Sequence, residues 1–275
     1  MQGRQRAARC SLIVVAVVIA TAGQAWAGPP VFGTLAVLNT QAPGKVGVEW
    51  NVQVTSVSPG KWVAVWHSTH SLGDKIGRDW DILVSRSADG GVTWTPPQPL
   101  NTNAAADRGN DRSPVVASDG AGYLLAVWTS ADPLDGKIGL DWDLLVARSP
   151  DGGRTWTLLP RGSGPADEVM IGTFQILRDG TFLCVQKNME GDKKGPVGVW
   201  ASGDEGRTWQ LRSQIKPTQA DGNLGPRVYG LFRLPDETLL CGIMGDNYVR
   251  SADKKKWVSG KYRHYIYRST DGGRT

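Results

Sequence analysis

The stretch Ser87-Ala88-Asp89-Gly90-Gly91-Val92-Thr93-Trp94 decides the fold, because it returns three times along the chain. It recurs at 149–156 (SPDGGRTW) and 202–209 (SGDEGRTW), and a fourth copy at 269–275 (STDGGRT) lacks only the final Trp. The shared pattern is S-x-D-x-G-x-T-W. A motif repeated in this way indicates a fold built from copies of one supersecondary unit.

The residues of this pattern suit a tight hairpin turn. We expect the Asp side chain to accept hydrogen bonds from backbone amides two residues on, and the Ser hydroxyl to act similarly. Glycine at the fifth position permits a backbone angle that a Cβ would disfavour. Thr and Trp then begin the next strand, with the indole packed between neighbouring sheets. The residues assigned to these turns are Asp89, Trp94, Asp151, Trp156, Asp204, Trp209 and Asp271.

The segments between the turns have the composition of strands. Runs rich in branched and aromatic residues precede three of the turns, at 82–86, 144–148 and 264–268. The four aspartates are 62, 53 and 67 residues apart, a period that holds about four short strands with their turns. The sequence therefore predicts an all-β fold, a β-propeller of four-stranded antiparallel blades with about four blades present.

The repeated motif resembles the Asp box, or BNR repeat, of sialidases (neuraminidases), and the resemblance covers roughly residues 35–275. It implies a propeller that has six blades when complete. Residues 28–275, whose fourth Asp box ends before its Trp, are therefore expected to form an incomplete propeller; an atypical final blade is the alternative. Asp boxes lie in outer turns and also occur in propellers that are not sialidases, so the resemblance implies the fold more strongly than the activity.

The first 27 residues have the pattern of an export signal. Three arginines precede a short apolar run, and Ala25-Trp26-Ala27 fits a cleavage site; an uncleaved membrane anchor is the alternative. Cleavage would lower the net charge from +5 to +2. We expect a secreted protein, extracellular or periplasmic, with no stable membrane insertion after cleavage. No basic stripe suits nucleic acid, and no nucleic-acid partner is expected.

No metal or other cofactor is expected. The sequence has neither C-x-x-C nor H-E-x-x-H. Two acidic pairs, Asp79 with Asp81 and Asp141 with Asp143, flank Trp80 and its counterpart in the next unit. Calcium would accept such oxygens, yet polar residues at a strand edge explain them too.

Two cysteines, Cys184 and Cys241, occupy matching places in successive units. Equivalent positions in adjacent blades should be too far apart for a disulfide, which needs Cα atoms within about 7 Å. We expect both side chains to be buried and unbonded.

The resemblance to sialidases implies a site with three arginines on the substrate carboxylate, a Tyr–Glu nucleophile and an Asp acid/base. The segment beginning at Arg227 resembles the sialidase R-I-P strand and its D-G-T-L-L turn, with Tyr229 in place of Pro. It implies that Arg227 and Tyr229 bind substrate, and that Asp246 or Asp253 in the following loop is the acid. Alternatively, Arg227 caps a strand and pairs with a neighbouring acid.

Two further positions are candidates. Arg112-Ser113-Pro114 also resembles R-I-P, and its aligned position in the preceding unit is Trp50. Arg112 is a candidate substrate contact, or else a solvated rim residue. Glu168 starts the third inner strand and is a candidate catalytic carboxylate, or else a surface acid. No Tyr–Glu pair can be assigned from spacing.

Two hypotheses follow. The first is a secreted glycoside hydrolase, resembling an exo-α-sialidase, that releases a terminal sialic or related acidic sugar from a glycan. The second is a non-catalytic propeller that binds glycan or protein, which the likeness of the first two units favours. Another propeller enzyme is a third possibility.

Overall fold

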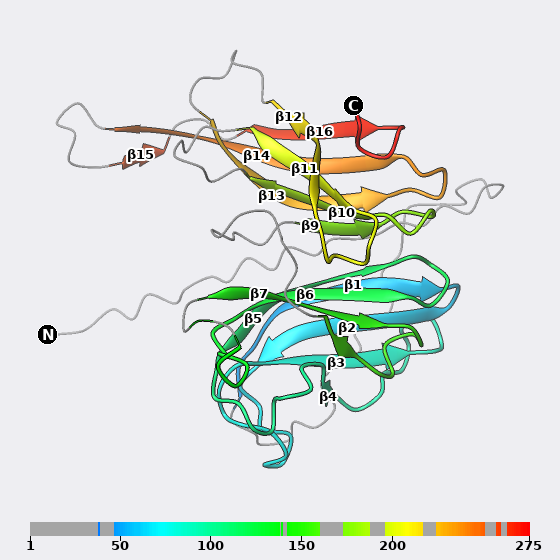
Figure 1. Ribbon diagram of the computed structural model, residues 1–275, viewed down its shortest axis with the longest axis vertical. Helices are drawn as coiled ribbons and strands as arrows, with labels where there is room; N and C mark the ends of the chain where they lie inside the picture. Colours follow the sequence, from blue (N-terminus) through cyan, green and yellow to red (C-terminus); the bar gives the residue numbers. More distant parts are fainter. Residues whose placement is uncertain are drawn as a thin grey trace, which may run out of the picture. The chain divides into compact units, whose positions relative to one another are not determined.

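The computed structural model describes residues 38, 47–137, 139, 142–159, 173–187, 196–216, 224–250, 257–259 and 263–275. All of them belong to one compact unit, Ala36–Thr275. Figure 1 shows strands throughout these ranges, and none of the described residues is helical. The described ranges accordingly contain no apolar helix of membrane-spanning length.

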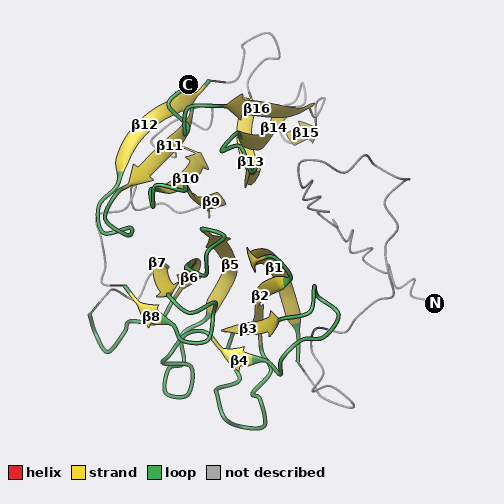
Figure 2. Ribbon diagram, turned by 90° about the vertical axis from the view of Figure 1, so that its right-hand side faces the viewer, coloured by secondary structure: helices red, strands yellow, loops and turns green. Residues whose placement is uncertain are grey.

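The strands form four antiparallel sheets, here called blades 1 to 4 (Figure 2). Blade 1 consists of β1 (Glu49–Ser58), β2 (Lys61–Ser68), β3 (Asp81–Ser87) and β4 (Gln98–Pro99). Blade 2 consists of β5 (Asp111–Ser118), β6 (Leu124–Ser130), β7 (Asp143–Ser149) and β8 (Thr157–Leu158). Blade 3 consists of β9 (Thr173–Ile176), β10 (Phe182–Lys187), β11 (Val197–Ser202) and β12 (Gln210–Ile215). Blade 4 consists of β13 (Leu224–Arg233), β14 (Leu239–Arg250), β15 (Trp257–Ser259) and β16 (Arg263–Ser269).

Blades 1 to 3 are meanders in which consecutive strands pair side by side. In blade 4, β14 pairs with β13 and β16, and β15 pairs with the end of β14. The first strands of successive blades contact one another in the order β1, β5, β9 and β13. Four antiparallel sheets arranged in this way are the blades of a β-propeller, which confirms the predicted fold class.

Alternating side chains build the cores between blades. In blade 2, Leu124, Ala126 and Trp128 pack against blade 1, where Val63 and Val65 are fully buried. The intervening Leu125 and Val127 pack against blade 3. Because successive side chains of a strand point to opposite faces, a sheet between two others needs apolar residues at nearly every position. The continuous apolar runs in the sequence therefore result from burial on both faces.

The Asp boxes form the turns that follow β3, β7, β11 and β16. Ser87 Oγ donates to Asp89 Oδ1 (2.8 Å) and accepts from the Gly91 amide (2.8 Å). Asp89 Oδ1 accepts from the Thr93 amide (2.9 Å). The expected acceptance of amides two residues on was therefore wrong, because the carboxylate spans the turn and reaches the fourth residue. Hydrogen bonds from the Thr93 hydroxyl and amide hold the pKa of Asp89 at about 2.

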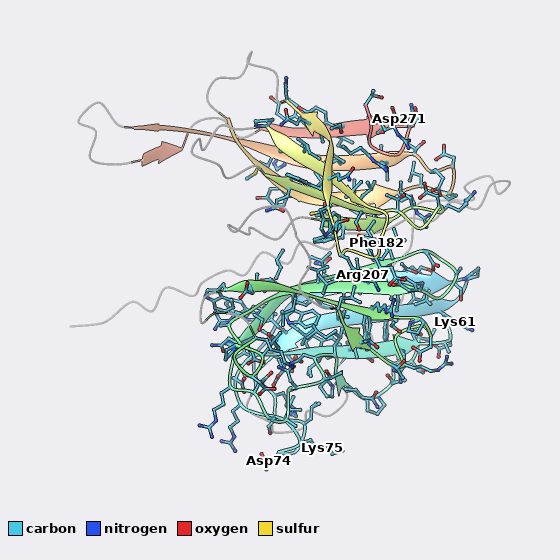
Figure 3. All side chains as sticks on the ribbon, in the orientation of Figure 1. Lys61, Asp74, Lys75, Phe182, Arg207 and Asp271 are labelled. Atoms are coloured by element: carbon cyan, nitrogen blue, oxygen red, sulfur yellow. The ribbon has the colours of Figure 1, made fainter. Side chains whose placement is uncertain are left out.

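The same turn recurs in the other blades. Asp151, Asp204 and Asp271 each accept from the amide four residues on, at 2.8 to 3.0 Å. Figure 3 labels Asp271 at the turn after β16. The expected positive φ occurs at every fifth position, for example at Gly153 (φ 82°), where an added Cβ would lie 3.0 Å from Val63 Cγ2.

The box tryptophans pack in two different ways. Trp156 packs on the core between blades 1 and 2, and Trp209 on the core between blades 2 and 3, as predicted. Trp94 instead packs on a cluster within blade 1. Strands β8 and β12 begin directly after Trp156 and Trp209, whereas β4 begins only at Gln98.

Arginines link each blade to the Asp box of the next. Arg86 of β3 donates to the Gly153 carbonyl (2.8 Å), and Arg212 of β12 donates to the Gly272 carbonyl (2.8 Å). Between blades 2 and 3, Arg148 of β7 forms an ion pair with Glu205. The outer turns therefore contribute to packing between blades as well as to chain reversal.

Cys184 and Cys241 are both buried and unbonded, as predicted. Cys184 lies in the core between blades 2 and 3, whereas Cys241 lies in the core between blades 3 and 4. Equivalent positions of adjacent blades thus contribute to two separate cores.

Candidate functional site

The first strands of blades 1, 2 and 4 present equivalent positions where a ligand site of a propeller can form. Trp50 of β1 pairs with His67, and Arg112 of β5 pairs with Thr129. Arg227 of β13 pairs with Met244. His67, Thr129 and Met244 each lie five residues beyond the residue of the second strand that pairs with the first serine of the Asp box. The register therefore places Trp50, Arg112 and Arg227 at the same level of their blades.

Bulges follow two of these positions. The register of β1 shifts after Trp50 and that of β5 shifts after Arg112. Asn51 and Ser113 have positive φ values of 53° and 55°. Bulges re-aim side chains and are common beside functional sites, and they also accommodate Pro114 within a strand. The two blades thus repeat the same local distortion.

Aromatic rings surround the Arg112 guanidinium. Its Cζ lies 5.2 Å from the ring centroid of Trp80 and 5.6 Å from that of Trp142. The Trp80 ring in turn contacts the rings of His67 (4.8 Å) and Trp50 (6.2 Å). We call these five residues the aromatic–arginine cluster. Trp80 comes from the β2–β3 connection and Trp142 from the β6–β7 connection.

The cluster offers both apolar faces and hydrogen-bond donors to a ligand. The residue Trp50 is 62% exposed and Trp142 is 49% exposed. Arg112 is half-buried, and its Nε has no acceptor among the described residues. A guanidinium that lies over ring faces keeps its N–H groups in its own plane, where they can bind a carboxylate.

His67 fixes the two bulged strands against each other. Its buried Nδ1 accepts a hydrogen bond from the Ser113 amide (3.1 Å), and Asn51 Nδ2 donates to Ser113 Oγ (3.3 Å). Burial, and secondarily the charge of Arg112, lowers the pKa of His67 to about 4. The imidazole is therefore neutral at neutral pH, with Nδ1 as the acceptor.

Replacing His67 by Gln is expected to weaken the acid sensitivity of folding. Between pH 6.5 and about 4 the unfolded chain binds a proton at His67 that the folded chain does not. The free energy of unfolding should fall as pH decreases through this window, by up to about 1.4 kcal/mol per pH unit. Gln retains an acceptor but does not titrate. Urea denaturation of both proteins across the window measures the difference, and identical pH slopes would contradict this role.

The other candidate residues lie in β13 or β14 or outside the described residues. Asp246 lies within β14, paired with Gly225, so the expected loop position was wrong: the β13–β14 ladder continues past it. Arg227 lies in β13 at the register given above. Tyr229 is exposed in the same strand, with its ring 6.4 Å from that of His264. Asp253 and Glu168 lie outside the described residues.

Sequence reasoning missed the roles of His67, Trp80 and Trp142. A signal for the two tryptophans was present, because K-I-G-x-D-W-D occurs in both of the first two units. We interpreted these segments through their aspartates alone. The tryptophan at the sixth position of each copy is the residue that contacts Arg112.

Comparison with known proteins supports the fold. No family profile matches the chain. A curated sialidase of Paraclostridium sordellii is 27% identical over 181 residues, which are 63% of this chain and 41% of the relative. The chain thus spans about two fifths of the length of that relative.

Solved structures with a similar fold include sialidases. Hadza microbial sialidase Hz136 has a TM-score of 0.52 at 19% identity, covering 82% of this chain and 45% of its own. NanB sialidase of Streptococcus pneumoniae has a TM-score of 0.50 at 10% identity, covering 90% and 54%. A Dyadobacter fermentans protein of unknown function has a TM-score of 0.53 at 16% identity, covering 82% and 66%. At these identities the likeness establishes the fold alone.

Proposed function

We propose that this sialidase-like β-propeller is part of a secreted glycoside hydrolase that resembles an exo-α-sialidase and releases a terminal sialic or related acidic sugar. The observation that carries the proposal is the placement of Arg112. Its guanidinium lies over two tryptophans at the start of an inner strand, beside the exposed ring of Trp50.

The chemistry of the cluster suits an acidic sugar. A guanidinium binds a carboxylate through two parallel charge-assisted hydrogen bonds. The apolar face of a sugar ring packs on an aromatic face, and Trp50 and Trp142 expose such faces next to the cation. Neutral His67 adds no competing charge. One ligand with a carboxylate and an apolar ring face therefore satisfies both features.

The proposal also gives roles in substrate binding and catalysis to the other candidate residues. Arg227, at the level of Arg112 in blade 4, is a second arginine for the carboxylate. Tyr229 is a substrate contact from the same strand, and Asp246, Asp253 and Glu168 are the candidates for acid/base catalysis. A protonated carboxylic acid would assist departure of the leaving group, as in glycoside hydrolysis generally.

Product analysis tests the proposal. The chain is incubated with an α-sialoside and, in parallel, with a neutral glycoside that has the same aglycone, and free sugar is measured by chromatography. We expect release of sialic acid only. No release together with no binding of sialic acid by NMR would overturn the proposal.

A second function is favoured by Trp50. Trp50 holds in blade 1 the position that Arg112 holds in blade 2, so the cluster presents an exposed aromatic residue there in place of a second arginine. Exposed aromatic residues in one patch are typical of binding surfaces. A non-catalytic propeller would bind the sialoside without releasing sugar, which the same experiment distinguishes. The expected lack of nucleic-acid and membrane partners stays a prediction.

A further inference from the structure

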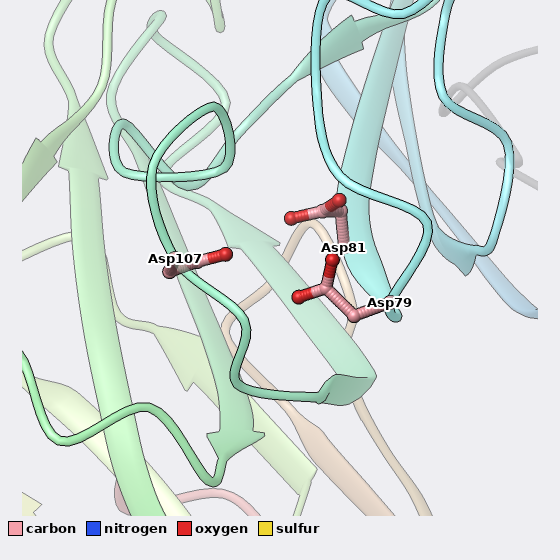
Figure 4. Close-up of side chains that lie close together, drawn as sticks. All are labelled: Asp79, Asp81 and Asp107. Atoms are coloured by element: carbon pink, nitrogen blue, oxygen red, sulfur yellow. The ribbon is translucent and has the colours of Figure 1, made fainter.

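Three carboxylates converge beside β3. Asp79 lies in the β2–β3 connection, two residues before Asp81, which begins β3, and Asp107 lies in the β4–β5 connection. Each offers an oxygen, and these oxygens all lie within 4.8 Å of one another. Figure 4 shows the three side chains pointing toward one another. Asp107 follows Asp81 by 26 residues and is brought to it by the fold.

The buried member of the group has an unsatisfied oxygen. Asp81 is only 1% exposed, and its Oδ1 accepts a hydrogen bond from Asn101 Nδ2 (3.0 Å). Its Oδ2 has no donor among the described residues, and the same holds for Asp79 Oδ2 and Asp107 Oδ1. A buried carboxylate oxygen without a partner is costly, and such an oxygen calls for a ligand.

Nothing nearby in the described ranges neutralises these charges. No lysine, arginine or histidine there forms an ion pair with the three carboxylates. The Asn101 amide is shared further, because it also contacts Asp107 Oδ2 (3.5 Å) and Asp111 Oδ2 (2.7 Å). One neutral amide group therefore serves several acids.

The backbone is shaped around Asp79. A Cβ added at Gly77 would lie 2.1 Å from Asp79 Oδ1, so any larger residue there would require this carboxylate to move from its present position. The Gly77 amide also donates to the Ala104 carbonyl (3.2 Å), which joins the two connections that supply Asp79 and Asp107. The oxygens are thus held together before any ligand arrives.

We propose that Asp79, Asp81 and Asp107 bind a divalent cation, and that Ca²⁺ is the ion the site suits best. Calcium takes oxygen ligands, carboxylates above all, and tolerates irregular geometry. Asp79 and Asp107 are half-buried, which leaves access for water to complete the coordination. From the sequence, Asp79 and Asp81 were expected to bind no metal. Asp107, the third carboxylate, joins them only in the folded chain.

The pKa values of Asp81 and Asp107 are raised, as expected for carboxylates whose negative charges no nearby positive charge among the described residues neutralises. Burial raises the pKa of Asp81 to about 7, and the neighbouring Asp79 charge adds to the effect. Burial and the charges of Asp81, Asp132 and Asp79 raise the pKa of Asp107 to about 7. A bound cation would favour the ionised forms instead.

The cation site adjoins the aromatic–arginine cluster. Trp80 lies between Asp79 and Asp81 in the sequence, its ring contacts Arg112, and its carbonyl accepts from the Asp111 amide (2.6 Å). A cation held by both flanking aspartates would fix the backbone that carries this indole. Cation binding should therefore order one wall of the cluster, whether or not the proposed hydrolase activity exists.

Calorimetry and thermal melting test the site directly. The full chain is freed of metal, and CaCl₂ is titrated into wild type, D81N, D107N and D135N at constant pH. Asp135 is exposed and has a positive φ that Asn tolerates, so D135N removes one charge outside the group. Wild type and D135N should bind one Ca²⁺ and melt at a higher temperature with it.

The variants in the group should behave differently. D81N and D107N should bind Ca²⁺ at least tenfold more weakly, with little or no calcium-dependent rise of the melting temperature. Metal-free D81N should melt at or above the temperature of metal-free wild type, because it lacks a buried charge; if it does not fold, D107N and D79N decide. Equal affinity in all variants, or no heat and no shift in wild type, would overturn the site.

Discussion

Replacing Arg112 by Gln is expected to weaken binding of sialic acid by about 10- to 150-fold, the loss of one charged hydrogen bond, and turnover at low substrate concentration by at least as much. Hydrogen bonds to a charged group contribute about 1.5 to 3 kcal/mol each, and Gln retains neither the charge nor the paired donors. The loss of a cation from between Trp80 and Trp142 adds to the effect. NMR titration with sialic acid measures binding, and sugar release measures turnover.

Two further variants sharpen this experiment. R112K keeps the charge but loses the fork of donors, so its affinity should lie between those of wild type and R112Q. R178Q is the matched control, because Arg178 is exposed in the β9–β10 turn, at the other end of the strands from the cluster. Affinity in R112Q equal to that of R178Q would exclude Arg112 as a ligand contact.

Replacing Leu124 by Ala is expected to lower the free energy of unfolding by about 2 to 5 kcal/mol. Leu124 is 0% exposed in the core between blades 1 and 2. Its Cδ1 would lie 3.3 Å from a Cβ at Gly153, so it also packs under the second Asp box. Its truncation would leave a cavity where two sheets and a turn meet. Urea denaturation measures the change as a shift of the midpoint at constant slope.

Leu211 offers a matched control for that substitution. It is a leucine in a strand of the same fold but is 45% exposed. L211A should cost less than about 1 kcal/mol, since nearly half of its surface contacts water in the folded state as well, so its truncation leaves no enclosed cavity. Similar losses in the two variants would show that blade packing at Leu124 is not the source of the stability.

The fold could be predicted from the sequence because the Asp box is a local structure. All hydrogen bonds of Asp89 in this turn join residues within the eight-residue motif. The strand at 82–86 was predictable for a similar reason, because β3 is buried on both faces and reads as a continuous apolar run. The reach of the carboxylate and the packing of Trp94 differed from expectation, because both depend on turn geometry that residue identity does not specify.

The candidate site depends on contacts between connections that are distant in sequence. Arg112 meets Trp80 from 32 residues before it and Trp142 from 30 residues after it. The bulges after Trp50 and Arg112 also shift which side chains face the cluster. A one-residue change of register would turn such side chains to the other face, so the cluster could not be assembled from spacing.

The resemblance to sialidases implied Arg112 and Arg227 as candidates, whereas the sequence by itself determined the repeated turn, the blade period and the apolar strands. These depend on short-range hydrogen bonding and on burial patterns that each segment carries in its own residues. Only the tertiary structure decided that Asp246 lies in a strand, that Arg112 lies over two indoles, and that Asp107 joins Asp79 and Asp81. The physical reason is that these contacts follow from strand register and blade packing, which set distances between segments that no single segment encodes.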